Sequence, residues 1–182
     1  MRAMVFAALL AALILPATAF SEDATGQDRA NAARACSALR TSMGLDLFRQ
    51  TYGTAASNRR NAFGRCVSQW TRAEHQNRQS ARAQCAAEQA DANFAASHDG
   101  KSFAQFYGTG PKGASAFGRC VSGKAKSASA EERQDTLNAA RQCKSERRTM
   151  GVPAFRAQYG KNANDRNAFG KCVSALAKAQ ND

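Results

Sequence analysis

One pattern recurs three times along this 182-residue chain and constrains its fold more than any other feature. The strings NAFGRCVS, SAFGRCVS and NAFGKCVS end at Ser68, Ser122 and Ser174. Each is preceded by an aromatic pair that ends in Tyr-Gly and, further upstream, by a second cysteine. Such self-similarity is typical of a chain built from equivalent units, each too small to bury much surface alone. We therefore expect three tandem repeat units, over residues 28–72, 73–126 and 129–180.

Each unit is predicted to contain three α-helices. In unit one, apolar residues from Ala32 to Met43 recur at the helical period, and Gly44 is expected to end that helix. Gly100 and Gly151 stand at the matching place in the other units. The second helix is short, with a Phe and a Tyr four residues apart, and the third begins at a good N-cap residue. These N-cap residues are Asn61, Ser115 and Asn167. No segment alternates with period two, so the sequence predicts an all-α fold.

The six cysteines fall into three equivalent pairs. Six cysteines allow 15 pairings, but the threefold repetition favours one bond within each unit. These bonds would join Cys36 to Cys66, Cys85 to Cys120 and Cys143 to Cys172. Each would connect the first helix of a unit to its third. The sequence has none of the closely spaced Cys and His motifs that zinc and haem sites use, so we predict structural disulfides with no metal and no cofactor.

Residues 1–19 have the pattern of a cleaved export signal. Arg2 supplies the positive start, Ala3 to Leu15 form an apolar run, and Ala17-Thr18-Ala19 is a small-x-small cleavage site. That run is too short to span a bilayer as an anchor. We therefore expect an exported protein, periplasmic or extracellular, that has no integral membrane segment after signal cleavage. Such compartments permit disulfides.

The two junctions between units are predicted to differ. Residues 66–85 contain no Pro or Gly, so the third helix of unit one is expected to continue into unit two as a polar, solvent-bridging rod. The second junction contains Gly123, and the run from Ser129 has the pattern of a capping box that starts a new helix. We expect the second junction to be the more flexible joint.

The glycine in each repeated F-G-[R/K]-C string falls about three residues into a helix, where glycine lowers the stability of the helix by roughly 1 kcal/mol relative to alanine. These residues are Gly64, Gly118 and Gly170. Two interpretations account for them: the first helix or the disulfide approaches the backbone closely, or the N–H groups of the first turn bind an anion. Basic residues flank each turn, as the second interpretation requires. They are Arg59, Arg60 and Arg65 in unit one, Lys112 and Arg119 in unit two, and Arg166 and Lys171 in unit three.

A formal net charge of +12 either keeps the chain soluble or attracts polyanions. For an exported chain these are lipopolysaccharide, teichoic acids, acidic polysaccharide and extracellular DNA. The two histidines, His75 and His98, occupy unrelated places, and no catalytic constellation is present. We expect a non-catalytic, envelope-associated binding protein that recognises an anionic polymer. The alternative is a protein-interaction or structural spacer module of the envelope, with Trp70 as a contact residue.

The elements A-[R/Q]-x-C, F-x-x-x-Y-G and N-A-F-G-[R/K]-C-V-S together resemble a short repeat found in exported bacterial proteins. The resemblance extends from about Ala33 to Ser174. It implies a bacterial, exported, disulfide-linked protein, and it brings no assigned activity and no catalytic residue. Unit two departs from the pattern through about six extra residues around Ala92 to His98, and through Ser115 in place of Asn.

Overall fold

The computed structural model describes residues 23–54, 59–110, 112–160 and 166–180. The predicted export signal lies outside these residues. The described chain has seven α-helices, one 3-10 helix and no strand, so the predicted all-α fold is confirmed. The helices are α1 (Gly26–Met43), α2 (Leu45–Tyr52), α3 (Ala62–Ala90), η2 (Phe94–Ser97), α4 (Phe103–Tyr107), α5 (Ala116–Met150), α6 (Val152–Tyr159) and α7 (Ala168–Ala179).

The three predicted disulfides are confirmed. Cys36 is bonded to Cys66, Cys85 to Cys120 and Cys143 to Cys172. Each bond lies inside one of three hydrophobic clusters, which are built mainly from alanine, cysteine and aromatic side chains. Three disulfides indicate a compartment other than the reducing cytoplasm. In the described part of the chain, no helix has the length and apolar character needed to cross a membrane.

The glycines that end the helices behave differently in unit two. Gly44 and Gly151 follow α1 and α5 directly, with φ of +78° and +83°. Gly100 also has a positive φ of +74°, but it does not end the first helix of its unit. That helix is part of α3 and ends at Ala90, and the extra residues of unit two form η2 before Gly100 is reached. The predicted equivalence of the three glycines is therefore wrong at Gly100.

Trp70 is a core residue, so its predicted role as a surface contact is wrong. It is 3% exposed, and its Nε1 donates a hydrogen bond to the Tyr52 hydroxyl at 3.2 Å. In the other units the equivalent tyrosine donates to a glutamate instead. Tyr107 donates to Glu88 at 2.8 Å, and Tyr159 donates to Glu146 at 2.6 Å. Unit one has Leu39 at the glutamate position, so the indole is the partner of its tyrosine.

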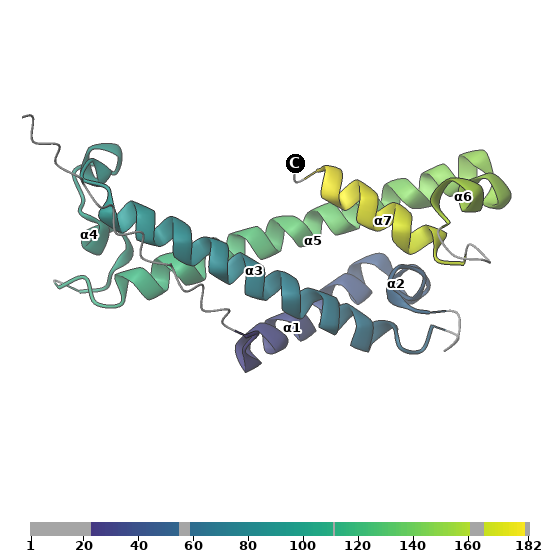
Figure 1. Ribbon diagram of the computed structural model, residues 1–182, viewed down its shortest axis with the longest axis horizontal. Helices are drawn as coiled ribbons and strands as arrows, with labels where there is room; N and C mark the ends of the chain where they lie inside the picture. The colour runs from purple at the N-terminus through teal and green to yellow at the C-terminus, as the bar shows by residue number, and fades with distance from the viewer. Residues whose placement is uncertain (1–22, 55–58, 111, 161–165, 181–182) are drawn as a thin grey trace, which may run out of the picture.

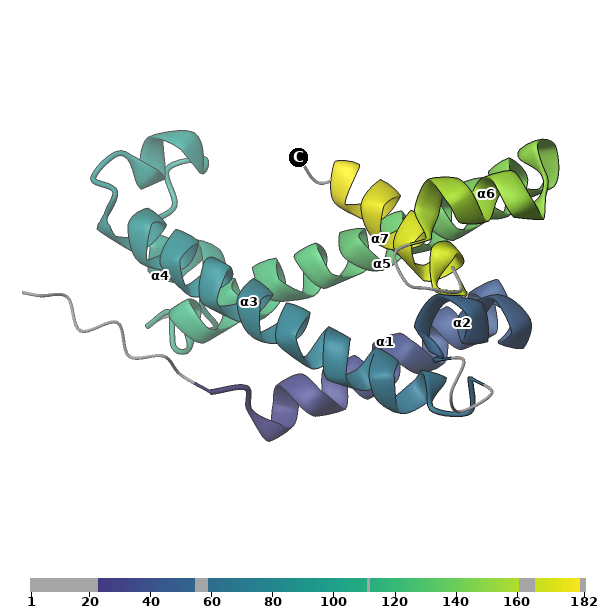
Figure 2. The same ribbon diagram turned by 45° about the vertical axis from the view of Figure 1, so that its right-hand side comes forward.

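Both junctions between units are continuous helices. As expected, α3 joins unit one to unit two without a break, but it is not a solvent-bridging rod, because it packs against α5 (Figures 1 and 2). The predicted flexible joint is wrong, because Gly123 and Ser129 both lie inside α5. Ser129 is 2% exposed, and its hydroxyl donates to Glu74 at 3.0 Å rather than capping a new helix.

The chain folds back on itself rather than forming a linear array. Figure 1 shows α3 and α5 crossing, with α4 at one end of the molecule and with α2, α6 and α7 at the other. Units one and three therefore lie together, and α2 contacts α7. Met43 of α1 packs against the hydrophobic clusters of both units. The described hydrophobic cluster of unit two lies at the opposite end and is built from residues of that unit.

A buried polar layer lies where α1, α3 and α5 meet. Asp28 is 2% exposed, and it accepts hydrogen bonds from Arg78 Nε at 3.2 Å and Nη2 at 3.1 Å. Burial opposes ionisation of Asp28, but the bonds from Arg78 and Thr25 outweigh it, so the pKa of Asp28 lies below its ordinary value. Burial raises the pKa of Glu74 and of Glu132, even though both accept hydrogen bonds.

We expect the substitution Glu74→Gln to raise the melting temperature at pH 7. Glutamine keeps an acceptor for Ser129 and removes a buried charge. The raised pKa values of Glu74 and Glu132 mean that wild-type stability increases as the pH falls from neutral towards those values. Asp28, with its lowered pKa, contributes stability above the ordinary value of 3.8 that is lost as the pH falls below it. Thermal melts between pH 3 and 8 test this, and a lower melting temperature for Glu74→Gln at pH 7 would contradict it.

Candidate functional site

Packing of unit three on unit one forms a cleft of about 550 Å³ between α3 and α7. One side of the cleft is lined by residues 50–54, at the end of α2. Each of the two helices presents one face, with residues spaced three, four and seven apart. The face of α3 consists of Arg65, Ser68, Gln69 and Arg72, and that of α7 consists of Gly170, Lys171 and Ser174, with Asn167 at the N-cap position before them. Arg166, just before α7, completes the lining.

The charged groups of this cleft all have the same sign. Arg65, Arg72, Arg166 and Lys171 are exposed and line it, and its described lining contains no Asp or Glu. Between the cations lie neutral hydroxyl and amide groups. Cations that share one cleft repel each other. An anion bound among them is attracted by every one of them, and this attraction offsets the repulsion.

A recess of about 60 Å³ adjoins the cleft at Arg166, which lines both. It is bordered by three further arginines, Arg59, Arg147 and Arg156, and again by no described acidic residue. Arg147 lies over the Phe169 ring, 5.2 Å from its centroid, and donates to the Gln50 side chain, so it links α5 to α2. We call the seven basic residues of the two pockets the basic seam. They are Arg59, Arg65, Arg72, Arg147, Arg156, Arg166 and Lys171.

The N-cap residues do not cap their helices in the predicted way. Asn61, Ser115 and Asn167 precede α3, α5 and α7 as expected, but none makes a side-chain capping bond. Asn61 instead accepts from the Thr54 N–H at 3.0 Å and donates to the Thr54 hydroxyl at 2.9 Å, which holds the end of α2 to the start of α3. The first-turn N–H groups, which have no partner within a helix, therefore receive no acceptor from these side chains.

The three glycines of the repeated string have different surroundings. A Cβ atom on Gly170 would lie 2.6 Å from the carbonyl oxygen of Thr51, so this glycine allows α7 to approach the end of α2. At Gly64 and Gly118 no atom lies within 4 Å of the Cβ position. Close packing therefore explains Gly170 alone. Its partner is α2 of unit one, not the first helix or the disulfide that the sequence suggested.

We expect the same substitution at the three glycines to change the stability of the protein in opposite directions. Gly170→Ala should destabilise the protein, because the new Cβ collides with a backbone oxygen. Gly64→Ala and Gly118→Ala should each stabilise it by up to about 1 kcal/mol, since alanine is the better helix former and space is open there. Denaturant unfolding of the three variants measures the difference, and a Gly170→Ala variant as stable as Gly64→Ala would contradict the contact.

Half of the predicted anion-binding residues border the seam pockets. These are Arg59, Arg65, Arg166, Gly170 and Lys171. Arg60 and Gly64 are exposed near the start of α3 and line neither pocket, and Lys112, Gly118 and Arg119 belong to unit two at the other end of the molecule. The Arg119 Nε donates to the Tyr107 carbonyl at 2.9 Å. The structure thus assembles one cleft from two units in place of one site per unit.

Sequence reasoning missed three members of the seam. Arg72 lies two turns after Arg65 on α3, and this spacing of seven could have revealed it. Arg147 and Arg156 lie far along the chain from unit one and have no local signal, because only the packing of unit three on unit one, through α2 and α7, brings them to the recess.

A second groove, of about 630 Å³, lies between α1, α3 and α5. It is lined by Arg34, Lys126 and Arg133, but also by Asp28 and Glu74. Its charges are therefore of both signs, and it suits an anion less well than the seam does.

The basic seam is thus the candidate site that the described residues support. No protein-family model, no curated protein and no solved structure matches this chain.

Proposed function

We propose that the protein is a non-catalytic binding protein that holds an anionic envelope or extracellular polymer in the basic seam. One observation carries the proposal: seven basic side chains from units one and three border adjoining pockets whose described lining has no carboxylate. Six of the seven are arginines. A guanidinium group pairs with carboxylate, sulfate or phosphate through two parallel hydrogen bonds, so arginine suits such a ligand better than lysine does.

The polar groups between the cations favour an acidic polysaccharide among the polyanions. Thr51, Thr54, Ser68, Gln69 and Ser174 line the same cleft and offer hydroxyl and amide groups to sugar hydroxyls. Phosphorylated or uronate-containing sugars, such as those of lipopolysaccharide, would meet both kinds of group. The proposed place of action is the periplasm or the outside of the cell, to which the leader over residues 1–19 would direct the chain.

The alternative of a protein-interaction spacer has less support. It relied on Trp70 and on a solvated connector, and the indole is buried while the connector packs against α5. The proposed site is also a single cleft formed by units one and three, in place of the separate site that the sequence suggested for each unit. The proposal therefore predicts one binding site per molecule.

Calorimetric titration of the oxidised protein tests the proposal. The probes are heparin as a sulfated polysaccharide, lipopolysaccharide, polyphosphate, and dextran as a neutral polysaccharide. We expect the acidic polysaccharides to bind at low salt and dextran not to bind, with the logarithm of the affinity falling linearly as the logarithm of the salt concentration rises. Absence of binding to every polyanion at low salt would contradict the proposed function.

A further inference from the structure

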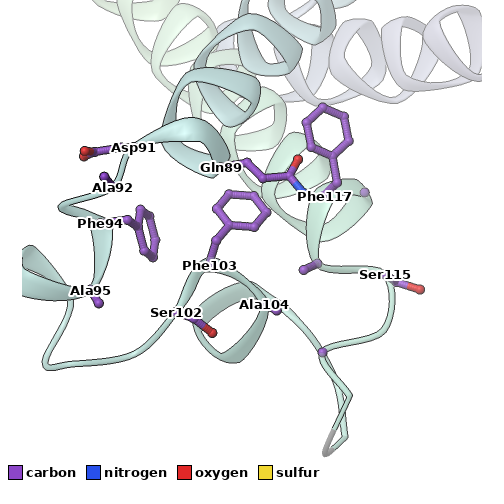
Figure 3. Close-up of a pocket in the computed structure, with 13 residues that line it drawn as sticks. Gln89, Asp91, Ala92, Phe94, Ala95, Ser102, Phe103, Ala104, Ser115 and Phe117 are labelled. Atoms are coloured by element: carbon purple, nitrogen blue, oxygen red, sulfur yellow. The ribbon is translucent and has the colours of Figure 1, made fainter.

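Unit two contains an aromatic pocket that the proposed function does not use. It has a volume of about 590 Å³, and Phe94, Phe103 and Phe117 line it. Figure 3 shows Phe94 and Phe103 at its centre, and the short Gln89 side chain reaching towards Phe117. The pocket lies at the α4 end of the molecule, opposite the basic seam (Figure 1).

The other two units show what this pocket lacks. In unit one, Arg40 lies over the Phe63 ring with its Cζ 5.5 Å from the centroid. In unit three, Arg147 lies over the Phe169 ring in the same way, at 5.2 Å. Each arginine follows the first cysteine of its unit by four residues, and each phenylalanine precedes the second cysteine by three.

Unit two keeps the phenylalanine and loses the arginine. Phe117 is the equivalent ring, and Gln89 occupies the arginine position. Among the Lys and Arg residues that the structure describes, none lies over Phe117. Glutamine is shorter and neutral, so it replaces neither the length nor the charge of the missing side chain.

The lining of this pocket also differs from the corresponding regions of the other units. The extra residues of unit two add Phe94, whose ring is 5.5 Å from that of Phe103 and is stacked on the His98 ring at 3.8 Å. Asp91 is the one charged residue in the described lining, although the chain as a whole has a net charge of +12. Aromatic rings attract a cation through their faces, and a nearby carboxylate adds to that attraction.

We propose that this pocket binds the guanidinium group of an arginine side chain from another polypeptide. The incoming group would stack on Phe117, in the place that Arg40 and Arg147 take in the other units. Gln89 Oε1, whose side chain reaches towards Phe117 in Figure 3, is the acceptor for its N–H groups, and the Asp91 carboxylate, which points away from Phe117, adds negative charge at the pocket edge. The pocket and the basic seam share no residue, so this interaction stands independently of the proposed function.

NMR titration of the oxidised, ¹⁵N-labelled protein with N-acetyl-arginine amide tests the proposal. We expect shifts of the Phe117 and Gly118 amides with a Kd of roughly 1 mM, as fits a single side chain. The neutral isostere N-acetyl-citrulline amide should bind at least about fivefold more weakly. Gln89→Arg should abolish binding, because it restores the missing arginine within the chain. Gln84→Arg, which adds the same charge on an exposed position of the same helix outside the pocket, should leave binding intact.

Phe117→Leu provides a second variant, which keeps an apolar side chain and removes the ring face, and it should also lose binding. Equal affinity for the arginine and citrulline probes, or equal binding by Gln89→Arg and Gln84→Arg, would overturn the proposal. So would the absence of shifts at Phe117 and Gly118. If the wild-type protein showed the same shifts on concentration alone, and Gln89→Arg removed them, a second copy of the chain would be the source of the arginine.

Discussion

Reduction of the three disulfides is expected to unfold the protein. The bonds close loops over sequence separations of 30, 35 and 29 residues. On the loop-entropy model each contributes about 3 to 4 kcal/mol, and the sum is comparable to the whole stability of an ordinary domain, about 5–15 kcal/mol. The buried residues are mainly alanine, cysteine and a few aromatic side chains, so the core offers little to replace that contribution. Circular dichroism and thermal melts with and without a phosphine reductant measure the effect, with intact mass to verify complete reduction.

Paired substitutions show how the effect divides among the units. Replacing Cys85 and Cys120 with alanine should unfold the α4 end of unit two first, since the hydrophobic cluster around that bond is built from residues of unit two, whereas the clusters of units one and three pack against each other's residues. Replacing Cys36 and Cys66 with alanine should disorder a smaller part of the chain, because unit three packs against unit one through α2 and α7. Hydrogen exchange read by mass spectrometry distinguishes the two. Unchanged helicity and melting after full reduction would show that the disulfides do not maintain the fold.

Neutralising the basic seam should abolish polyanion binding at moderate salt. In the variant with glutamine at positions 65, 72, 166 and 171, four exposed cations of the cleft are lost. We expect the affinity for heparin to fall at least about 100-fold at low salt, and the slope of log affinity against log salt to decrease by roughly three to four, one for each anionic group no longer contacted. Calorimetry at several salt concentrations measures both quantities.

The matched control removes the same charge from unit two. Glutamine at the exposed residues Lys101, Lys112, Arg119 and Lys126 gives the same net charge at positions outside the seam. This control should keep most of the affinity and of the salt slope. Equal losses in the two variants would mean that binding follows total charge, and the seam would then not be a site.

Local sequence signals predicted the secondary structure where neighbouring residues decide it. The apolar period of α1 ends at Gly44, whose positive φ suits glycine, and the short aromatic helices end at Tyr-Gly as expected. The same kind of signal failed at Ser129. Its capping pattern predicts a helix start, but its hydroxyl instead bonds to Glu74, 55 residues away, and the helix continues through it. A local propensity of about 1 kcal/mol is overridden when packing against another helix offers a buried partner.

The sequence by itself determined the all-α class and the pairing of the six cysteines, because repetition and the helical period are properties of short stretches of chain. Only the tertiary structure decided that α3 and α5 cross and bring unit three onto unit one. That contact depends on residues such as Gly170 and Thr51, which are more than a hundred positions apart and share no local pattern. The basic seam therefore exists only in the folded chain: its side chains come from α3, α5, α6, α7 and the segments just before α3 and α7, and the crossing of the two long helices brings them together.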